Sequence, residues 1–210
     1  MHAAIRILSL TALASALLAV AAGAQAPAAE EDGYRLWLRY EPVTDSAVSA
    51  PYRAAFSTLA VPGTTPTAAA VRDELRRGLT GLLATAPRSG TVSAAVPGTL
   101  VAGTPEDLPG LDAGTLERLE RAGDEGYVVG PARVAGRDVM VVAGNTDVGV
   151  LYGAFALLRH LQAGRPLEEL PLLSAPRVGL RLLNHWDNLD RTVERGYAGF
   201  SLWDWHTLPD

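Results

Sequence analysis

The chain has 210 residues and a formal net charge of −5, and it contains no cysteine. The acidic balance argues against nucleic-acid binding, which normally requires a basic face. The lack of cysteine excludes disulfides and thiolate metal sites. The length suffices for one ordinary domain and a piece of another.

Residues 1–24 have the pattern of a secretory signal peptide. Arg6 supplies the positive start, a core rich in Leu and Ala follows, and Ala22-Gly-Ala24 is a small-x-small cleavage site. The apolar core is shorter than the ~20 residues that a membrane span requires, so an uncleaved anchor is the weaker alternative. We therefore predict cleavage after Ala24, export to the periplasm or the cell exterior, and a flexible acidic lead-in over residues 25–33.

The mature chain is predicted to begin with a strand over Tyr34–Tyr40, an aromatic and apolar run that Pro42 ends. Trp37 points to the other face of this strand. We interpret it as packing against a neighbouring element, with sugar stacking as the alternative. Residues 43–66 carry three prolines and a glycine, which indicates a long loop with one short turn.

Two long helices, one short helix and one short strand are predicted in the middle of the chain. Thr67 is expected to cap a helix that runs to about Ala84, because apolar residues recur there at helical spacing. A short apolar strand over Thr99–Ala102 and a charged helix over Leu111–Ala122 follow, and Val148–Gln162 is the second long helix. The apolar positions of the two long helices are Val71, Leu75, Leu79, Leu82 and Leu83, and then Leu151, Phe155, Leu158 and Leu161.

Residues 125–143 predict a β-hairpin, in which Tyr127–Val129 and Arg133–Val134 face Asp138–Ala143 across a turn centred on Gly136. His160, near the end of the second long helix, is interpreted as solvated or as satisfying the helix end, not as a ligand.

The elements together predict an α/β two-layer sandwich over residues 34–164, with a sheet of about four strands and two main helices on one face. The proline-rich residues 165–176 are expected to form a stiff linker.

Residues 177–210 combine short apolar runs with polar and aromatic clusters. Val178–Leu183 predicts a buried strand, and hydrogen-bonding and aromatic residues follow it directly. A strand that ends in such a cluster is typical of the mouth of a β/α barrel. Ser201–Trp205 is a second strand-like run. We therefore expect 177–210 to be the beginning of an incomplete (β/α)8 TIM barrel, truncated at Asp210.

Two parts of the chain resemble glycosidases. Gly144–Arg159 resembles the sheet-to-helix turn of the small domain that precedes the barrel in several families, including the β-hexosaminidases. A sharper resemblance is to the start of the catalytic barrel in glycoside hydrolase family 67, the xylan α-1,2-glucuronidases. Its motifs are Leu182–Asp190 (LLNHWDNLD), Glu194–Gly199 (ERGYAG) and Trp203–Trp205 (WDW), and Tyr34–Tyr40 matches the opening strand of that family's N-terminal domain. Arg191 and Phe200 depart from the small and polar residues typical of those positions.

The resemblance implies the front of a secreted enzyme that removes 4-O-methyl-glucuronic acid from the terminal xylose of xylo-oligosaccharides, with inversion and without a metal or other cofactor. Inversion needs a carboxylic acid and a carboxylate base roughly 6.5–9.5 Å apart. The family's pair lies on later barrel strands, so no catalytic residue is expected in this chain, and the chain alone is predicted to be inactive.

The substrate-binding candidates form one run. By position, Trp186 matches a tryptophan that lines the pocket around the 4-O-methyl group, where a flat apolar ring covers the sugar and excludes water. The residues beside it could hydrogen-bond the sugar, although loop capping is an equal alternative for the Asp and Asn after Trp186. They are Asn184, His185, Asp187 and Asn188.

Other functions remain open. A free-standing carbohydrate-binding or accessory module would use the four tryptophans as a platform, and a hexosaminidase-like barrel glycosidase could carry the same small domain. The run around Trp186 favours family 67 over the latter. A barrel with only its first strands cannot close, which argues against the module. The acids Asp187, Asp190, Glu194 and Asp204 are poor catalytic candidates, because nothing in the chain would bury one of them and raise its pKa.

The expected partners are a glucuronic-acid-substituted xylo-oligosaccharide and the missing C-terminal barrel. Neither nucleic acid nor a membrane is expected beyond the signal peptide, and a homodimer is left open for the full-length protein.

Overall fold

The computed structural model describes residue 35 and residues 38–182. Met1–Arg39 and Tyr40–Asp210 are two separate compact units, and the fold below is that of the second. In the first unit the Leu38 amide donates a 2.8 Å hydrogen bond to the Arg35 carbonyl, so the described residues form a turn. The predicted strand Tyr34–Tyr40 is therefore wrong over these residues. The predicted signal peptide and residues 183–210 lie outside the described residues.

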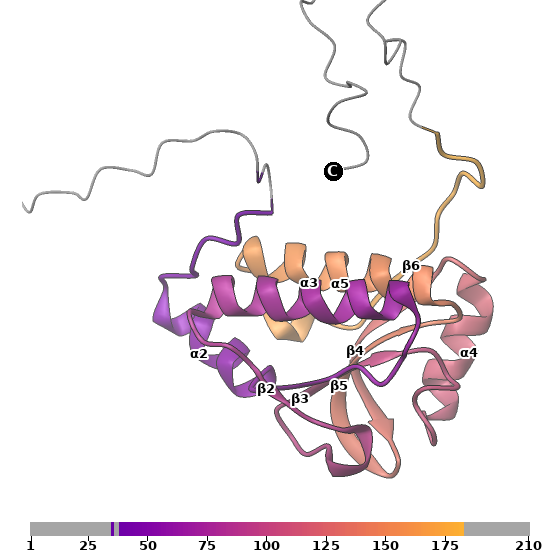
Figure 1. Ribbon diagram of the computed structural model, residues 1–210, viewed down its shortest axis with the longest axis horizontal. Coiled ribbons are helices and arrows are strands. Elements are labelled where there is room, and N and C mark those ends of the chain that lie inside the picture. The colour runs from indigo at the N-terminus through magenta and orange to yellow at the C-terminus, as the bar shows by residue number, and fades with distance from the viewer. Residues whose placement is uncertain (1–34, 36–37, 183–210) are drawn as a thin grey trace, which may run out of the picture. The chain divides into compact units, whose positions relative to one another are not determined.

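A six-stranded mixed sheet forms the centre of the domain (Figure 1), in the order β2-β1-β3-β5-β4-β6. The first four strands of this order run parallel, and β4 is antiparallel to both β5 and β6. The strands are β1 Thr58–Ala60, β2 Arg88–Ser89, β3 Thr99–Gly103, β4 Tyr127–Val134, β5 Arg137–Gly144 and β6 Leu172–Ser174. The three central strands were predicted, whereas the short strands β1, β2 and β6 were not.

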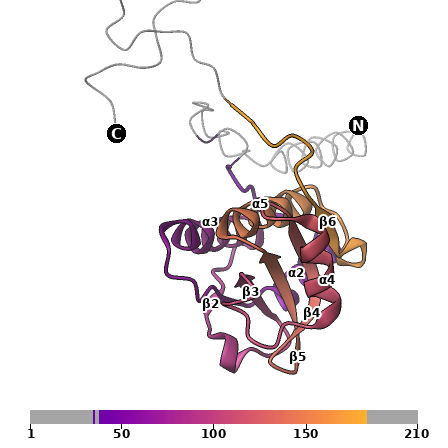
Figure 2. The ribbon, with the colours of Figure 1, turned by 90° about the vertical axis from the view of Figure 1, so that its right-hand side faces the viewer.

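Within residues 38–182 four α-helices surround the sheet, and α3 and α5 lie side by side on one face (Figures 1 and 2). They are α2 Ser46–Ala55, α3 Pro66–Leu83, α4 Ala113–Ala122 and α5 Asp147–Gln162, with single 3-10 turns at Val92–Ala94 and Leu167–Glu169. The predicted α/β sandwich, with its two main helices on one face, is confirmed. No helix within residues 38–182 is both long and apolar enough to cross a membrane.

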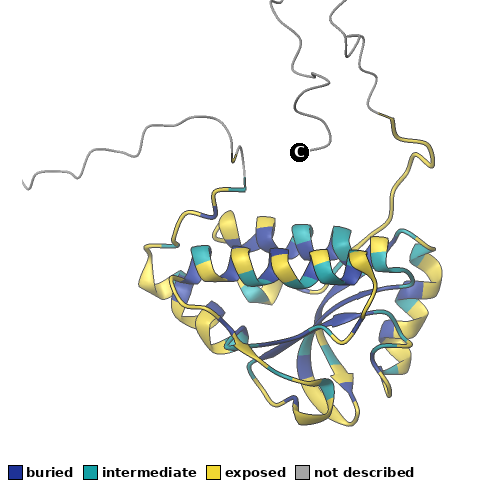
Figure 3. Cartoon of the chain, viewed as in Figure 1, coloured by how far each residue is buried: buried dark blue, intermediate teal, exposed yellow. Residues whose placement is uncertain are grey.

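The sheet is buried on both faces at its centre, where all five residues of β3 and residues 141–144 of β5 are buried. Val142 of β5 faces α5, since a Cβ on Gly153 would lie 2.8 Å from its side chain. The neighbouring Val141 belongs to a separate buried cluster with Leu119 of α4. Successive side chains of a strand point to opposite faces, so α4 lies on the face opposite α3 and α5. Figure 3 shows the inner sides of the helices buried and their outer sides exposed.

Helix α2 occupies part of the predicted loop. Asp45 caps it by accepting a 2.8 Å hydrogen bond from the Ala47 amide. Pro51 lies inside the helix and removes one backbone donor. The loss is outweighed by burial of Tyr52, whose hydroxyl donates a 2.5 Å bond to the Arg165 carbonyl, and of Phe56. The loop prediction weighed local proline signals only and missed these distant partners.

Helix α3 begins two residues earlier than predicted. Thr65 is its N-cap and Pro66 its first residue, a position that suits proline because its missing N–H would have no helical partner. The five predicted apolar positions of α3 are all buried. Its glycines allow close packing: a Cβ on Gly78 would lie 2.5 Å from the Leu158 side chain of α5, and one on Gly81 2.5 Å from the Tyr40 carbonyl oxygen.

The predicted hairpin is confirmed, with Val134 opposite Arg137 and a two-residue turn between them. Both turn residues, Ala135 and Gly136, have positive φ, 49° and 77°, as a type I′ turn requires.

Helix α5 is confirmed, but its buried face is rotated from the predicted one. Leu151 and Phe155 are half-buried, whereas Leu158 and Leu161 are buried. His160 is 4% exposed and its Nε2 lies 3.0 Å from the Pro166 carbonyl oxygen, so the solvated interpretation is wrong.

Part of the predicted linker 165–176 belongs to the sheet. Strand β6 pairs with the outer edge of β4, placing Leu172 opposite Val129 and Ser174 opposite Tyr127. The domain therefore extends at least to Ser174. Composition could not indicate this, because a three-residue strand exists only through its pairing.

Candidate functional site

The predicted substrate-binding residues, Asn184, His185, Trp186, Asp187 and Asn188, lie outside the described residues, as does the predicted barrel start beyond Leu182. Their roles stay predictions. The structure does describe the chain that leads to them, and this segment contacts the α/β domain.

The approach segment, defined here as residues 177–182, bends at Arg177 and Gly179 and forms no strand. Val178, Leu180 and Leu182 are 59%, 74% and 80% exposed. The prediction of a buried strand is therefore wrong for the described part of this run. A strand needs a neighbour to satisfy its backbone groups, and none pairs with this segment within residues 38–182.

Arg181 is the residue of the approach segment that faces the domain. Its Nη2 donates a 2.7 Å hydrogen bond to Glu125 Oε2 and a 3.2 Å hydrogen bond to the Tyr152 hydroxyl. Its guanidinium carbon lies 5.8 Å from the centre of the Tyr152 ring, within cation–π range. The hydrogen bond to Glu125, followed by the one to Tyr152, raises the pKa of Arg181 above its usual value.

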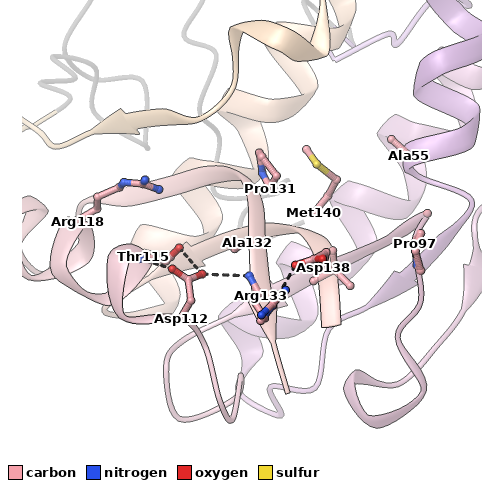
Figure 4. A pocket seen from close by; sticks show the side chains of 12 residues that line it. Ala55, Pro97, Asp112, Thr115, Arg118, Pro131, Ala132, Arg133, Asp138 and Met140 are labelled. Atoms are coloured by element: carbon pink, nitrogen blue, oxygen red, sulfur yellow. Dashed lines mark hydrogen bonds and ion pairs between the residues drawn. The ribbon is translucent and has the colours of Figure 1, made fainter. Parts of the chain in front are cut away.

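An open pocket of about 500 Å³ lies where the β4–β5 hairpin meets α4 (Figure 4), and Pro97, Arg118 and Pro131 are among its lining residues. Two carboxylates line it, Asp112 and Asp138, which raises the question of a catalytic acid pair.

Asp112 is already engaged. Its carboxylate accepts 2.9 Å bonds from the Thr115 amide and hydroxyl and a 3.0 Å bond from the Arg133 amide. The Asp112 amide in turn donates a 2.9 Å bond to the Arg133 carbonyl, which closes the free edge of β4. Burial alone would raise the pKa of Asp112. The bonds from Arg133 and Thr115 and the charge of Arg118 outweigh burial and lower it.

The pocket therefore does not fit an inverting glycosidase site. A general acid must keep its proton near neutral pH, which requires a raised pKa, and Asp112 has a lowered one. Asp138 is ion-paired with Arg133, whose Nε lies 3.1 Å from its carboxylate. The lining also lacks the aromatic rings that commonly stack on sugars. We assign these groups to capping α4 and the edge of β4.

A second hollow of about 310 Å³ adjoins α2, with Phe56 and Pro87 in its lining. Its Arg53 donates 3.0 Å bonds to the Leu83 carbonyl and to the Ser49 hydroxyl, so two of its donor nitrogens are already engaged. Among residues 38–182, no three His, Asp or Glu residues gather in a way that could hold a metal ion.

Glu74 is a buried acid on α3. It is 7% exposed, accepts a hydrogen bond from the Tyr40 hydroxyl and pairs with Arg77. Burial, followed by the bond to Glu74, raises the pKa of Tyr40 far above its usual value. Both polar groups are satisfied, so the cluster fixes the start of the domain on α3. In the sequence, only the i,i+3 spacing of Glu74 and Arg77 indicates this cluster.

Comparison with known proteins gives two family matches. The profile described as "Glycosyl hydrolase family 67 N-terminus" matches residues 36–157, and "Glycosyl hydrolase family 67 middle domain" matches residues 160–210.

α-Glucuronidase A of Emericella nidulans is 32% identical over an alignment that covers 92% of this chain and 22% of that protein. A probable α-glucuronidase A of Aspergillus terreus is 39% identical over 33% of this chain and 8% of its own length. The chain thus spans 22% of the Emericella protein. Among solved structures, a family GH115 4-O-methyl-α-glucuronidase with specificity for decorated arabinogalactans matches with a TM-score of 0.35 and 22% identity, over 50% of this chain and 13% of that one.

Proposed function

Because this chain belongs to glycosyl hydrolase family 67, we propose that it is the N-terminal part of a secreted α-glucuronidase. The proposed reaction is inverting hydrolysis of the α-1,2 bond between glucuronic acid, or its 4-O-methyl ether, and xylose in xylo-oligosaccharides during xylan breakdown. The observation that carries the proposal is the 32% identity to α-glucuronidase A over 92% of the chain.

The two regions of the chain have different proposed roles. Residues 40–174 form the supporting α/β domain, and residues 177–210 begin the TIM barrel that binds the substrate. Trp186 is proposed to line the pocket around the 4-O-methyl group of the uronic acid, with the four polar residues around it as hydrogen-bonding candidates. Family membership favours this function over the hexosaminidase-like alternative.

The catalytic pair is proposed to lie outside the described domain. An inverting enzyme needs an acid and a base facing each other across the scissile bond. In the described part of the chain, the carboxylates of Asp112 and Glu74 are both committed to structural hydrogen bonds. We therefore propose that these 210 residues alone do not hydrolyse the substrate.

The test is release of 4-O-methyl-glucuronic acid from an aldouronic oligosaccharide by the 210-residue chain, the full-length gene product and its Trp186→Ala and Trp186→Phe variants. The 210 residues should be inactive and the full-length protein active. Loss of one stacked ring costs on the order of 1–3 kcal/mol, so Trp186→Ala should lose roughly tenfold to a hundredfold in kcat/KM. Trp186→Phe keeps a flat ring and should retain most of the activity.

Each part can fail separately. Turnover by the 210 residues would contradict the placement of the catalytic pair. An inactive full-length protein would contradict the α-glucuronidase function. Unchanged kinetics in Trp186→Ala would remove Trp186 from the site.

A further inference from the structure

We propose that Arg181, Glu125 and Tyr152 form a clamp, named here the Arg181 clamp, that positions the substrate-binding segment 184–188 relative to the α/β domain. The inference rests on the proposed function, since it assigns positioning residues to the same site. Arg181 contacts Glu125, which lies 56 positions earlier in the sequence, and Tyr152, which lies 29 positions earlier.

The geometry of the clamp restricts the direction of the chain. One guanidinium group meets a carboxylate, a phenol oxygen and the face of the same aromatic ring. A second nitrogen of Arg181, Nη1, donates a 2.5 Å bond back to the Val178 carbonyl. The planar fork of Arg suits several simultaneous contacts, whereas Lys presents a compact point charge. The Arg181 side chain therefore binds the approach segment to the domain and also makes a hydrogen bond within the segment.

The two elements that receive Arg181 are packed against each other. Glu125 lies in the turn before β4 and Tyr152 on α5, and these two elements approach closely: a Cβ on Gly149 would lie 2.5 Å from the Gly126 carbonyl oxygen. The Asn145 side chain donates bonds of 2.6 and 3.0 Å to the Leu119 and Gly123 carbonyls.

The hydroxyl of Thr146 adds a 2.7 Å bond to the Asp124 carbonyl. The turn Gly144–Asp147, part of the segment that resembles other glycosidases, thus fixes the two partners of Arg181 relative to each other.

The approach segment turns its apolar side chains away from this surface. Val178, Leu180 and Leu182 alternate with Gly179 and Arg181, and the three apolar side chains are exposed. Arg181 stands three positions before Asn184 and five before Trp186. Consecutive Cα atoms are about 3.8 Å apart, so anchoring position 181 limits the paths open to the residues that follow it.

The ion pair is exposed at 38% for Arg181 and 39% for Glu125, and exposed pairs add little to folding stability. We therefore expect the clamp to act on the position of the segment and not on the stability of the domain. Its loss should weaken substrate binding without removing any group that touches the reacting atoms.

The first experiment measures the position of the approach segment directly. The chain has no cysteine, so spin labels can be placed on Leu182→Cys and on Glu117→Cys of α4, both exposed. Double electron–electron resonance should give one narrow distance distribution, and Arg181→Ala should broaden it roughly twofold by admitting further conformations. Arg177→Ala, an exposed arginine of the same segment, is the matched control and should leave it narrow.

The second experiment measures the consequence for catalysis in the full-length gene product. Arg181→Ala and Glu125→Gln should raise KM for an aldouronic oligosaccharide roughly fivefold, the upper range for an exposed pair, with kcat changed much less. Arg181→Lys keeps the charge and should restore part of the affinity. If Arg181 were needed only for folding, its substitution would lower the yield of active enzyme. Apparent kcat would then fall while KM stayed unchanged.

The outcomes separate the clamp from the function. A distribution as narrow in Arg181→Ala as in the parent, or a KM that does not change when the distribution broadens, overturns the proposal. Broadening in a full-length protein with no glucuronidase activity supports the physical clamp and contradicts the proposed function alone.

Discussion

At the scale of single residues, close packing decides where small side chains are needed. Gly78 would be a weak point in an isolated helix, because glycine costs about 1 kcal/mol relative to alanine. In the folded domain it lets α3 approach α5, and a Cβ there would lie 2.5 and 2.7 Å from the two methyl carbons of Leu158. Leu158 is fully buried, so its side chain has little room to move.

We expect Gly78→Ala to destabilise the domain. Overpacking costs about 1–3 kcal/mol and exceeds the gain in helix propensity of about 1 kcal/mol. The control is Ala70→Gly, at an exposed position of the same helix, which loses propensity alone. Urea denaturation followed by circular dichroism should show both variants to be less stable. Opposite signs for the two substitutions would mean that propensity governs Gly78 and that the packing argument is wrong.

At the scale of elements, the ends of helices are joined to the edges of strands. Asp112 caps α4 and also binds the Arg133 amide on the outer edge of β4. Beyond the three residues that pair with β6, this edge would otherwise present free backbone groups, which invite pairing with other chains. One side chain therefore both begins a helix and protects a sheet edge.

Asp112→Ala should lower the free energy of unfolding by about 1 kcal/mol or more, since loss of an N-cap alone costs about 0.5–2 kcal/mol. Asp45→Ala, which removes the cap of α2 and no strand contact, should cost less. Because the folded pKa of Asp112 is lowered, its contribution is present above the unfolded value near pH 3.8 and is lost as the pH falls through the folded pKa. Denaturation at pH 7 and pH 3 measures this. An equal cost for Asp112→Ala at both pH values would contradict the ionised cap.

At the scale of the whole molecule, the approach segment is held to the α/β domain by contacts as well as by the chain itself. Strand β6 brings residues 172–174 into the sheet, and Arg181 contacts Glu125, both within Tyr40–Leu182. The predicted linker is therefore shorter than the proline pattern suggests, and a protease should cut after Ser174 more readily than within residues 165–174.

Export is the remaining expectation for the whole chain. Arg6, the apolar core and Ala22-Gly-Ala24 predict that the secreted protein starts at Gln25. N-terminal sequencing of protein recovered outside the cytoplasm measures this directly, and Ala24→Arg, which places a large charge at the cleavage position, should block processing. A protein that keeps Met1 and stays in the cytoplasm would contradict secretion.

Elements with local signals could be predicted from the sequence alone. The hairpin β4–β5 carries two apolar runs around a turn with Gly136, and α3 and α5 have helical periodicity. The motifs from Leu182 onward indicated the family that the profile matches establish. These signals arise from interactions within a few residues of one another, so they can be recognised without knowing the fold.

Only the tertiary structure decided the features that depend on distant partners. Strands β1, β2 and β6 have two or three residues each and form because other strands lie beside them. Glu74 and His160 are buried because Tyr40 and the chain around Pro166 cover them. Arg181 meets Glu125 across 56 positions of sequence. Such contacts depend on how the helices and strands pack together, and no local pattern specifies which distant residues this packing brings into contact.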